Sequence, residues 1–541
     1  MKPILNFFEW YLERAPISQF YFITNFLRSM EDILGISVNI KYFFASIFGD
    51  KSWLGRFLTF IFRTAIIICG TIILTTVSII LLFIPIIWFF GVFFAYYYPL
   101  LITIPLITII YYALHSNASP KKINPLNIST IELLNYTDHD TSVLLDQYQT
   151  ADFYRSLETN LQVIQFKHRL QLSSINFGEI LSNSSHFIID DLLNSLQNLS
   201  STHNIRYFRP THIFYCILIL NQRQLSQTLL DNKLDIQLLD KYLSWDEYEY
   251  TLKHPPQFWD KDYKVYTGGG TNRTWQGTIT PILNEISNDL TANPQVLHKQ
   301  VYRTELISQV EEALSKTENS NVILMGDIGV GKKTLVKQIA DIINYGQAKG
   351  PLWSKRIVEL NIGQLYSNSG TDRGGFESKV ESLIKEISNS GNIILFIDDF
   401  QSAVETGSPS GLSLFTLLQS PLTHHQLHII GALTPREYKE VENKNSSFLK
   451  QFTLIKVSDT SKEQSTHIVH TECIKLEQIH SLFFPYATID SIVGYSDIYI
   501  HDVGLPQKAL DLLEDIIVHT ENSHILPNIQ TTSGPKILIN E

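Results

Sequence analysis

The chain has few cysteines and no excess of positive charge. Its 541 residues include three cysteines, which stand far apart at Cys69, Cys216 and Cys473. Three cysteines are too few for a disulfide framework, and this scarcity favours a reducing compartment. The formal net charge is −11, so the protein lacks the global positive field that attracts a nucleic-acid backbone. We therefore expect no nucleic-acid partner.

Charged residues are also absent from a long segment near the N-terminus. Residues 64–114 contain no Asp, Glu, Lys or Arg, although a membrane-spanning helix needs only about 20 apolar residues. The segment is long enough for two transmembrane helices, and Pro85, Trp88 and Gly91 place the predicted hairpin turn near residues 86–92. The alternative is a buried pair of core helices, which would need a polar face that this segment lacks.

The predicted hairpin has basic residues on both flanks. They are Lys51, Arg56 and Arg63 before it and Lys121 and Lys122 after it. Because positive flanks remain in the cytoplasm, we expect a multi-pass protein of the cell membrane whose soluble domains are cytoplasmic. Residues 1–63 mix aromatic and charged side chains, which is typical of an interfacial amphipathic region, and an ordinary amphipathic bundle is an equal alternative.

The rest of the chain divides by composition and periodicity. Residues 115–149 are rich in Asn, Ser, Thr and Pro and form a predicted spacer. Apolar residues at helical spacing predict an all-α domain over 150–245, and a glycine-containing linker follows at 246–279. Apolar runs then alternate with helical patterns over 280–454, which indicates a parallel sheet covered by helices. Helices are predicted again over 455–520, followed by a tail at 521–541.

One of these apolar runs ends in a glycine-rich loop. The loop comprises Gly326, Asp327, Ile328, Gly329, Val330, Gly331 and Lys332, and a helical pattern follows it. Backbone amides of such a loop and the N-terminus of the next helix bind phosphates, and Lys332 would reach the terminal phosphates. The next residue should be Ser or Thr, whose hydroxyl binds Mg²⁺. Here that position is Lys333 and the hydroxyl comes one residue later, at Thr334, which predicts ATP binding with weak dependence on Mg²⁺.

A second apolar run ends in two carboxylates. Asp398 and Asp399 directly follow a predicted buried strand, where a phosphate-binding ATPase places one acid for Mg²⁺ and another to activate water. We assign Asp398 and Thr334 as candidate metal ligands and Asp399 as the candidate base. The alternative is that both acids cap the turn that follows the strand.

Several segments, in this order, resemble the ClpA, ClpB and ClpC proteins. The resemblance covers residues 280–520 and, more weakly, 150–245. The matching segments are TPILNEISNDLT at 280–291, GDIGVGKKT at 326–334, ELNIGQLYSNSGTDRGGFE at 359–377, ILFIDDF at 394–400, GALTPREYKEVENKNSSFLKQF at 431–452 and SDIYIHDVGLPQKALDLLED at 496–515. The resemblance implies an α/β fold, a P-loop AAA+ parallel sheet with a helical lid, here preceded by the all-α domain and two transmembrane helices. It also implies ATP and Mg²⁺ as cofactors, a homo-hexamer, and protein substrates or adaptors as partners.

The resemblance also exposes departures from the family at the catalytic positions. The family's water-activating Glu is replaced by Asp399, and its paired trans-acting arginines fall on Lys450 and Gln451. The sensor threonine falls on Leu433 or on Thr434. Lys508 is expected in the lid, near the phosphates. These departures indicate that binding is better preserved than turnover.

Two further segments bear on what such a protein does to a polypeptide. The family's pore loop has an aromatic residue before Arg-Gly, and this position is Asp372 here, which predicts that the chain does not thread polypeptides. The alternative is that Tyr366 or Phe376 serves instead. The tripeptide Val503, Gly504 and Leu505 resembles a peptidase-docking motif but leads into the predicted lid, so no peptidase docking is expected.

Two functions remain open from the sequence. The first is a membrane-anchored ATP-dependent chaperone or protein-remodelling subunit with slow ATP hydrolysis. The second is a pseudo-ATPase scaffold that recruits partners to the membrane without hydrolysis. A transporter is disfavoured because the apolar segment has no ionisable group of the kind that marks an ion pathway.

Overall fold

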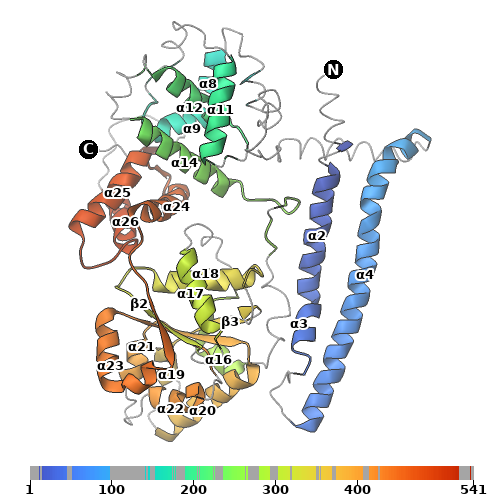
Figure 1. The fold of residues 1–541 in the computed structure, drawn as a ribbon, viewed down its shortest axis with the longest axis vertical. Helices are drawn as coiled ribbons and strands as arrows, with labels where there is room; N and C mark the ends of the chain where they lie inside the picture. The colour runs from blue at the N-terminus through green and yellow to red at the C-terminus, as the bar shows by residue number, and fades with distance from the viewer. Residues whose placement is uncertain are drawn as a thin grey trace.

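The structure, a computed structural model, describes most of the regions in which elements are predicted. The described ranges are 15–44, 52–97, 153–173, 189–203, 207–222, 235–261, 263–265, 280–292, 303–316, 320–348, 355–367, 373–405, 414–423 and 427–522, with short stretches or single residues between and beside them. Figure 1 shows the resulting arrangement of helices and strands.

The N-terminal region consists of helices that run alongside one another. They are α2 (Ala15–Leu34), α3 (Ile36–Lys41) and α4 (Trp53–Tyr97). α2 and α4 lie side by side in Figure 1. The hydroxyl of Tyr11 is bonded to the carbonyl oxygen of Trp88, and Gly70 lies against Leu34 and Ile36, so α2 runs antiparallel to α4.

The predicted hairpin turn near residues 86–92 is wrong. α4 continues through this segment to Tyr97 with Pro85 inside it. A proline removes one backbone hydrogen bond and can kink a helix, but it need not end a helix whose other residues favour continuation. The remainder of the apolar segment, residues 98–114, lies outside the described residues.

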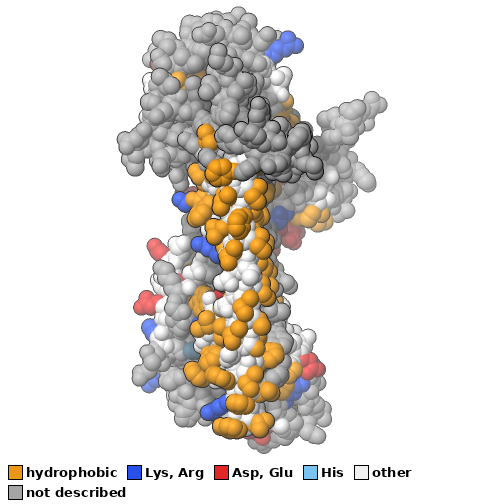
Figure 2. Space-filling model, turned by 90° about the vertical axis from the view of Figure 1, so that its right-hand side faces the viewer, with side chains coloured by type: hydrophobic (Ala, Val, Ile, Leu, Met, Phe, Trp, Pro, Cys, Tyr) orange, Lys and Arg blue, Asp and Glu red, His pale blue; other side chains and the backbone are white. Residues whose placement is uncertain are grey.

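α4 is the helix, among those that the structure describes, that is long and apolar enough to cross a membrane. Its candidate span is Trp53–Trp88, within which an 18-residue window has a mean hydropathy of 2.7 and is only 6% buried. Figure 2 shows its apolar side chains as a continuous stripe on one face of the molecule. Arg63 is fully buried and donates to the side-chain oxygen of Asn39 at 3.1 Å.

The predicted all-α region does consist of helices in its described parts. They are α8 (Phe153–Thr159), α9 (Leu161–Arg169), α11 (Ile189–His203), α12 (Pro210–Leu220) and α14 (Ile236–Lys253). α12 is apolar on all sides and its residues from Pro210 to Leu218 are buried, so it forms the centre of this bundle. α14 continues past residue 245, so the first part of the predicted linker is helical.

The α/β region is built on one six-stranded sheet with the order β1-β3-β4-β5-β2-β6. Its strands are β1 (Ser287–Asp289), β2 (Asn321–Met325), β3 (Arg356–Leu360), β4 (Ile393–Ile397), β5 (Ile429–Leu433) and β6 (Phe452–Lys456). The strands from β2 to β6 pair in parallel, as predicted, but β1 pairs antiparallel with β3, so the sheet is mixed. β6 was not predicted as a strand.

Helices cover both faces of this sheet, which explains why its central strands are continuous apolar runs. The helices are α16 (Pro281–Glu285), α17 (Thr304–Leu314), α18 (Lys332–Asn344), α19 (Ile362–Ser367), α20 (Arg373–Ser390), α21 (Phe400–Glu405), α22 (Leu414–Thr423) and α23 (Pro435–Leu449). Two separate hydrophobic clusters lie on the two faces. Val322 and Leu324 belong to one cluster, and Ile323 between them belongs to the other.

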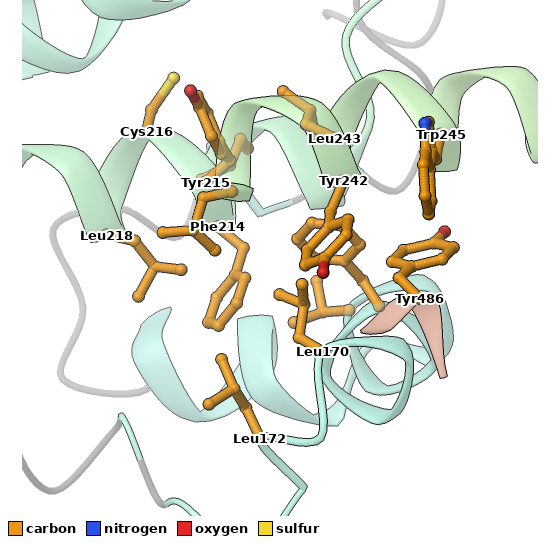
Figure 3. Packing of buried hydrophobic residues seen from close by; sticks show 14 of the residues in the cluster. Leu170, Leu172, Phe214, Tyr215, Cys216, Leu218, Tyr242, Leu243, Trp245 and Tyr486 are labelled. Atoms are coloured by element: carbon orange, nitrogen blue, oxygen red, sulfur yellow. The ribbon is translucent and has the colours of Figure 1, made fainter. Parts of the chain in front are cut away.

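The lid packs against the helical bundle formed by α8, α9, α11, α12 and α14. Its elements are α24 (Lys462–His480), β7 (Leu482–Phe483), α25 (Tyr486–Tyr499), α26 (Gln507–Asn522) and β8 (Lys536–Ile537). One hydrophobic cluster contains residues of both regions. In Figure 3, Tyr242 and Trp245 of α14 meet Tyr486 of the lid, with the Trp245 and Tyr486 ring centroids 5.6 Å apart. We call this cluster, together with the buried ion pairs of Arg169 beside Tyr486, the joint core.

Candidate functional site

A cavity of about 750 Å³ opens between the sheet and the lid. It lies at the carboxyl ends of β2, β4 and β5, where open parallel sheets bind ligands. Its lining from the α/β region is Arg303, residues 328–335, Lys337, Gln338, Asp398, Asp399, residues 432–434 and Glu437, and its lining from the lid region is Thr460, Ile468, Thr471, Glu472, Lys475, Pro506, Gln507 and Leu510.

The glycine-rich loop follows β2 into α18, as predicted. Gly329 and Gly331 have φ values of +84° and +88°, which side chains on L-residues rarely adopt. A Cβ at Gly329 would also come within 2.7 Å of the Gln507 Cβ. Gly331 precedes α18 without a side-chain cap, so the first amide groups of this helix remain available for an anion.

Lys332 lies folded over this loop. Its ammonium group donates to the carbonyl oxygens of Gly326 at 2.7 Å and Asp327 at 2.9 Å. Burial lowers the pKa of Lys332, and the nearby carboxylates of Glu437 and Asp398 oppose that shift. A phosphate at this position would replace the two neutral carbonyl acceptors with a charged acceptor, which binds an ammonium group more strongly.

Lys333 joins two strands through their acids. Its ammonium group forms an ion pair with Glu359 of β3, and it lies 3.8 Å from an Asp398 carboxylate oxygen at the end of β4. Burial raises the pKa of Asp398, and Lys333 opposes that shift. One ammonium group therefore lies between two carboxylates where a phosphate-binding ATPase has a hydroxyl.

Asp399 is occupied in a cap. Its carboxylate accepts hydrogen bonds from the backbone amide of Ser402, at 3.1 Å, and from the Ser402 hydroxyl. These bonds tie it to the first turn of α21, as the alternative for this residue predicts. Asp399 also lines the cavity, so the structure brings it to the site and gives it a structural task there.

Thr434 is likewise a capping residue. Its hydroxyl accepts from the amide of Glu437, and the Glu437 carboxylate accepts from the amide of Thr434 at 2.7 Å. This reciprocal pair begins α23. Thr434, Leu433 and Glu437 all line the cavity, so Glu437 is an additional acid at the site, and the capping pattern in the sequence is the signal that could have found it.

The structure does not bring Lys508 or Lys450 to the cavity. The ammonium group of Lys508 is buried and donates to Asp497 at 3.1 Å and to the carbonyl oxygen of Ile500 at 3.3 Å. This position inside the lid corrects the expectation that Lys508 lies near the phosphates. Lys450 is exposed at the end of α23, so within this chain it does not serve the cavity.

Sequence reasoning did not find several residues that the fold brings to the cavity. Arg303 donates to the carbonyl oxygen of Val330 at 2.9 Å and so supports the loop from outside. Glu359 on β3 is not part of the cavity lining and reaches the site through its ion pair with Lys333; it begins the matching segment at 359–377, but nothing in that segment marks it as a site residue. Thr471 comes from the face of α24 that meets the loop. None of these has a local sequence signal, because each depends on tertiary packing.

The tripeptide Val503, Gly504 and Leu505 contacts the phosphate-binding loop. The amide of Gly504 donates to the carbonyl oxygen of Ile328 at 2.8 Å, and a Cβ at Gly504 would come within 2.8 Å of a Val330 methyl carbon. Leu505 is buried. These contacts fix the lid on the loop.

Phe376 is buried in the core on one face of the sheet, so it cannot grip a polypeptide. Asp372 and the side chain of Tyr366 lie outside the described residues.

The residues of the cavity fit a nucleoside triphosphate but not the expected magnesium ion. A glycine cradle, a free helix N-terminus and Lys332 are the groups that hold phosphates. Mg²⁺ requires oxygen ligands in near-octahedral geometry. Here an ammonium group stands beside Asp398, and Thr334 is exposed at the next position. The expected pair of ligands, Asp398 and Thr334, is therefore not assembled as a magnesium site.

Comparison with known proteins supports the assignment of this cavity as a nucleotide site. Residues 322–436 match the ATPase family associated with various cellular activities, and residues 461–530 match the AAA lid domain. The negative regulator of genetic competence ClpC/MecB of Bacillus subtilis is 31% identical over 252 residues, which is 46% of this chain and 31% of that protein. The chain therefore contains a region that matches an AAA ATPase domain followed by one that matches an AAA lid domain, and this part of the chain is similar to ClpC. The P-loop α/β fold with a helical lid is thereby confirmed, with a mixed sheet in place of the predicted parallel one.

Two other proteins match a similar share of this chain. The Clp protease ATP-binding subunit ClpE of B. subtilis is 32% identical over 237 residues, or 43% of this chain and 34% of that protein. A structure of the S. cerevisiae Hsp104:casein complex aligns with a TM-score of 0.41 at 24% identity, covering 45% of this chain and 42% of that one. The chain spans about a third of the length of these curated relatives.

Proposed function

We propose that the AAA+ module binds ATP through the loop from Gly326 to Lys332 and uses it mainly as a regulatory ligand. The observation that carries this proposal is the loop itself, in which Gly329 and Gly331 have positive φ and Lys332 lies over the phosphate position. Backbone amides and the helix N-terminus supply the binding groups, and Lys332 supplies the charge.

Several features favour slow turnover over rapid hydrolysis. Asp399 is one methylene shorter than the glutamate expected at its position, and its carboxylate caps α21. A displacement of about 1 Å can reduce a rate by about a hundredfold. Lys450 stands where the family has an arginine, and an ammonium group lacks the bidentate fork of a guanidinium. If the chain forms the hexamer that the family resemblance suggests, the neighbouring subunit contributes this weaker group.

The joint core supports a role for the helical bundle as the output of the nucleotide site. Ile468, Thr471, Glu472 and Lys475 of α24 line the cavity, while Val469 and Cys473 of the same helix belong to the joint core. The hydroxyls of Tyr248 and Thr471 are 2.8 Å apart. A nucleotide-dependent shift of α24 would therefore reach α14 directly. We propose that the bundle receives protein substrates or adaptors under this control.

Membrane attachment through α4 is part of the proposal. With 45 residues, α4 is about 68 Å long, which exceeds the roughly 30 Å of a bilayer core. The side-chain amide of Asn25 in α2 donates to the carbonyl oxygens of Phe258 and Asp260, so insertion of the middle of α4 requires these two bonds to break. Because α4 is one continuous helix, both flanks can be cytoplasmic only if the chain crosses the membrane again between residues 98 and 122. Reporter fusions before residue 60 and after residue 122 test this second crossing: the same, cytoplasmic side supports it, and opposite sides indicate a single crossing by α4.

The central experiment measures ATP binding and phosphate release on one sample of purified full-length protein. We expect saturable binding together with phosphate release far below that of an Asp399→Glu variant. Rapid release by the wild-type protein would favour the active chaperone or remodelling subunit. Absence of binding by the folded protein would refute the site and leave a scaffold that does not use nucleotide.

A further inference from the structure

A cluster of charged side chains lies beside the phosphate-binding loop, and phosphate binding alone does not require it. It consists of Lys333, Glu359 and Asp398. Glu359 lies on β3 and Asp398 ends the neighbouring strand β4, so the sheet fixes their separation. The Glu359 side chain is only 15% exposed. A carboxylate buried to this extent needs a cation beside it, and Lys333 provides that cation.

The position of this cation is the informative feature. Lys333 is the second residue of α18, directly after the loop lysine. In a phosphate-binding ATPase the residue at this position holds Mg²⁺ through its hydroxyl. Lys333 has no oxygen to offer, and its ammonium group lies 3.8 Å from Asp398, the acid expected to orient the metal.

A divalent cation at this place would meet an existing positive charge. Like charges a few ångströms apart repel, and the repulsion grows with partial burial. The Glu359 carboxylate fixes the ammonium group here, since the pair would have to break before Lys333 could move away. Lys333 therefore already compensates the carboxylates of Glu359 and Asp398 without a bound metal ion.

We propose that the Lys333 ammonium group, positioned by Glu359, takes the place of Mg²⁺ and that the module binds the metal-free form of a nucleoside triphosphate. This inference rests on the proposed ATP binding and specifies the form of the ligand. Lys332 is the loop lysine that magnesium-dependent sites also have, so Lys333 adds one positive charge where a magnesium ion adds two elsewhere. Glu359 is a positioning residue, because it acts through Lys333.

The test is titration calorimetry of full-length protein with ATP, in excess EDTA and in excess Mg²⁺. For the wild-type protein we expect dissociation constants within about threefold of each other, since the two lysines supply the charge in both conditions. The Lys333→Thr, Glu359→Ala double variant restores the hydroxyl and removes the unpaired acid. It should bind ATP at least tenfold more weakly in EDTA than in Mg²⁺.

Lys337→Thr is the matched control. Lys337 is on the same helix, lines the same cavity and carries the same charge, so its loss should leave the ratio of the two dissociation constants unchanged. Wild-type binding that weakens more than tenfold in EDTA would overturn the proposal while leaving ATP binding intact. Absence of wild-type binding in both conditions would overturn the proposed function itself. Glu359→Gln, which keeps the shape of the side chain, should raise the EDTA to Mg²⁺ ratio in the same direction as the double variant.

Discussion

The nucleotide loop and the joint core use the two faces of the same helix, α24, but they are built in different ways. The loop is a continuous segment whose function depends on backbone amides, glycines and one lysine. The joint core is assembled from residues such as Arg169 and Glu477, which are 308 positions apart. A continuous motif can be recognised from sequence, whereas the interface that transmits its state depends on tertiary contacts.

The two regions also handle charge differently. In the loop, Lys332 has carbonyl partners that a phosphate can replace. In the joint core, the Arg169 guanidinium contacts Glu477 at 2.8 Å and Glu249 at 3.0 Å, and its side chain is 4% exposed. These carboxylates hold the pKa of Arg169 above its usual range against the effect of burial. The loop is therefore suited to exchange partners, and the joint core to keep them.

The largest effect is expected from breaking the joint core. Arg169→Met should lower the free energy of unfolding by about 3 to 5 kcal/mol, because it leaves the Glu477 carboxylate without its buried cation and Glu249 with Lys253 alone. Urea denaturation followed by circular dichroism measures this loss. The control is Lys241→Ala, which removes a partly exposed pair with Asp490 and should cost about 0 to 1 kcal/mol. Equal losses for the two variants would mean that the joint core is no more than surface contact.

Lys332→Ala should produce the converse result. Losing charge-assisted bonds to phosphate costs about 1.5 to 3 kcal/mol, so ATP affinity should fall roughly 10- to 100-fold while the unfolding transition stays nearly unchanged. Calorimetry and denaturation of the same preparation measure both quantities. Lys337→Ala, on the same helix, should leave affinity within about threefold. If Lys332→Ala lowers the free energy of unfolding as much as Arg169→Met does, Lys332 stabilises the fold and the prediction is wrong.

Acid should weaken the helical bundle beside the joint core. Although burial acts to raise it, Arg209 and His212 lower the pKa of Glu247 to about 2 from an ordinary 4.5. A lowered folded-state pKa contributes stability that is fully present above pH 4.5 and is lost as the pH falls toward 2. The helical signal of the wild-type protein should fall across this window, and Glu247→Gln should show a shallower fall from a lower starting stability. Identical profiles would refute this role of Glu247.

The smallest expected effect is at the contact between the lid and the loop. Gly504→Ala would place a methyl group 2.6 Å from an Asp459 carboxylate oxygen and 2.8 Å from a Val330 methyl carbon, so the lid must shift. We expect ATP affinity to fall by about threefold to tenfold, as for a loss of about 1 kcal/mol. Gly494→Ala in α25 meets nothing within 4 Å and should leave affinity unchanged. Equal ATP affinities of these two variants would show that the contact between the lid and the loop does not contribute to ATP binding.

Local patterns predicted the elements of this fold better than their association. The apolar runs that became β2, β3, β4 and β5 and the loop after β2 were found, because their signals are continuous. The turn near residues 86–92 was wrong because Pro85 and Gly91 are compatible with a continuing helix. The end of α14 was missed because Asp246 and Glu249 look like linker residues until their buried partners, Arg209 and Arg169, are known.

The candidate site divides in the same way. Lys332 and Asp398 line the cavity as their motifs indicate. Lys508 was misplaced because a partner in the lid, Asp497, takes its charge. Glu359 was missed because only the neighbouring strand and helix give it meaning. A capping role for Asp399 was one of the alternatives predicted from the sequence. The capping role of Thr434 follows from its reciprocal pair with Glu437.

Hydrogen exchange of the full-length protein with and without saturating ATP tests most directly whether the nucleotide site and the helical bundle act through α24. Amides of α18 should gain protection because they hold phosphate, and those of α24 should follow because this helix lines the cavity. We predict that protection extends to α14, through Tyr248 and the joint core. Protection of α18 with no change in α14 would contradict the account.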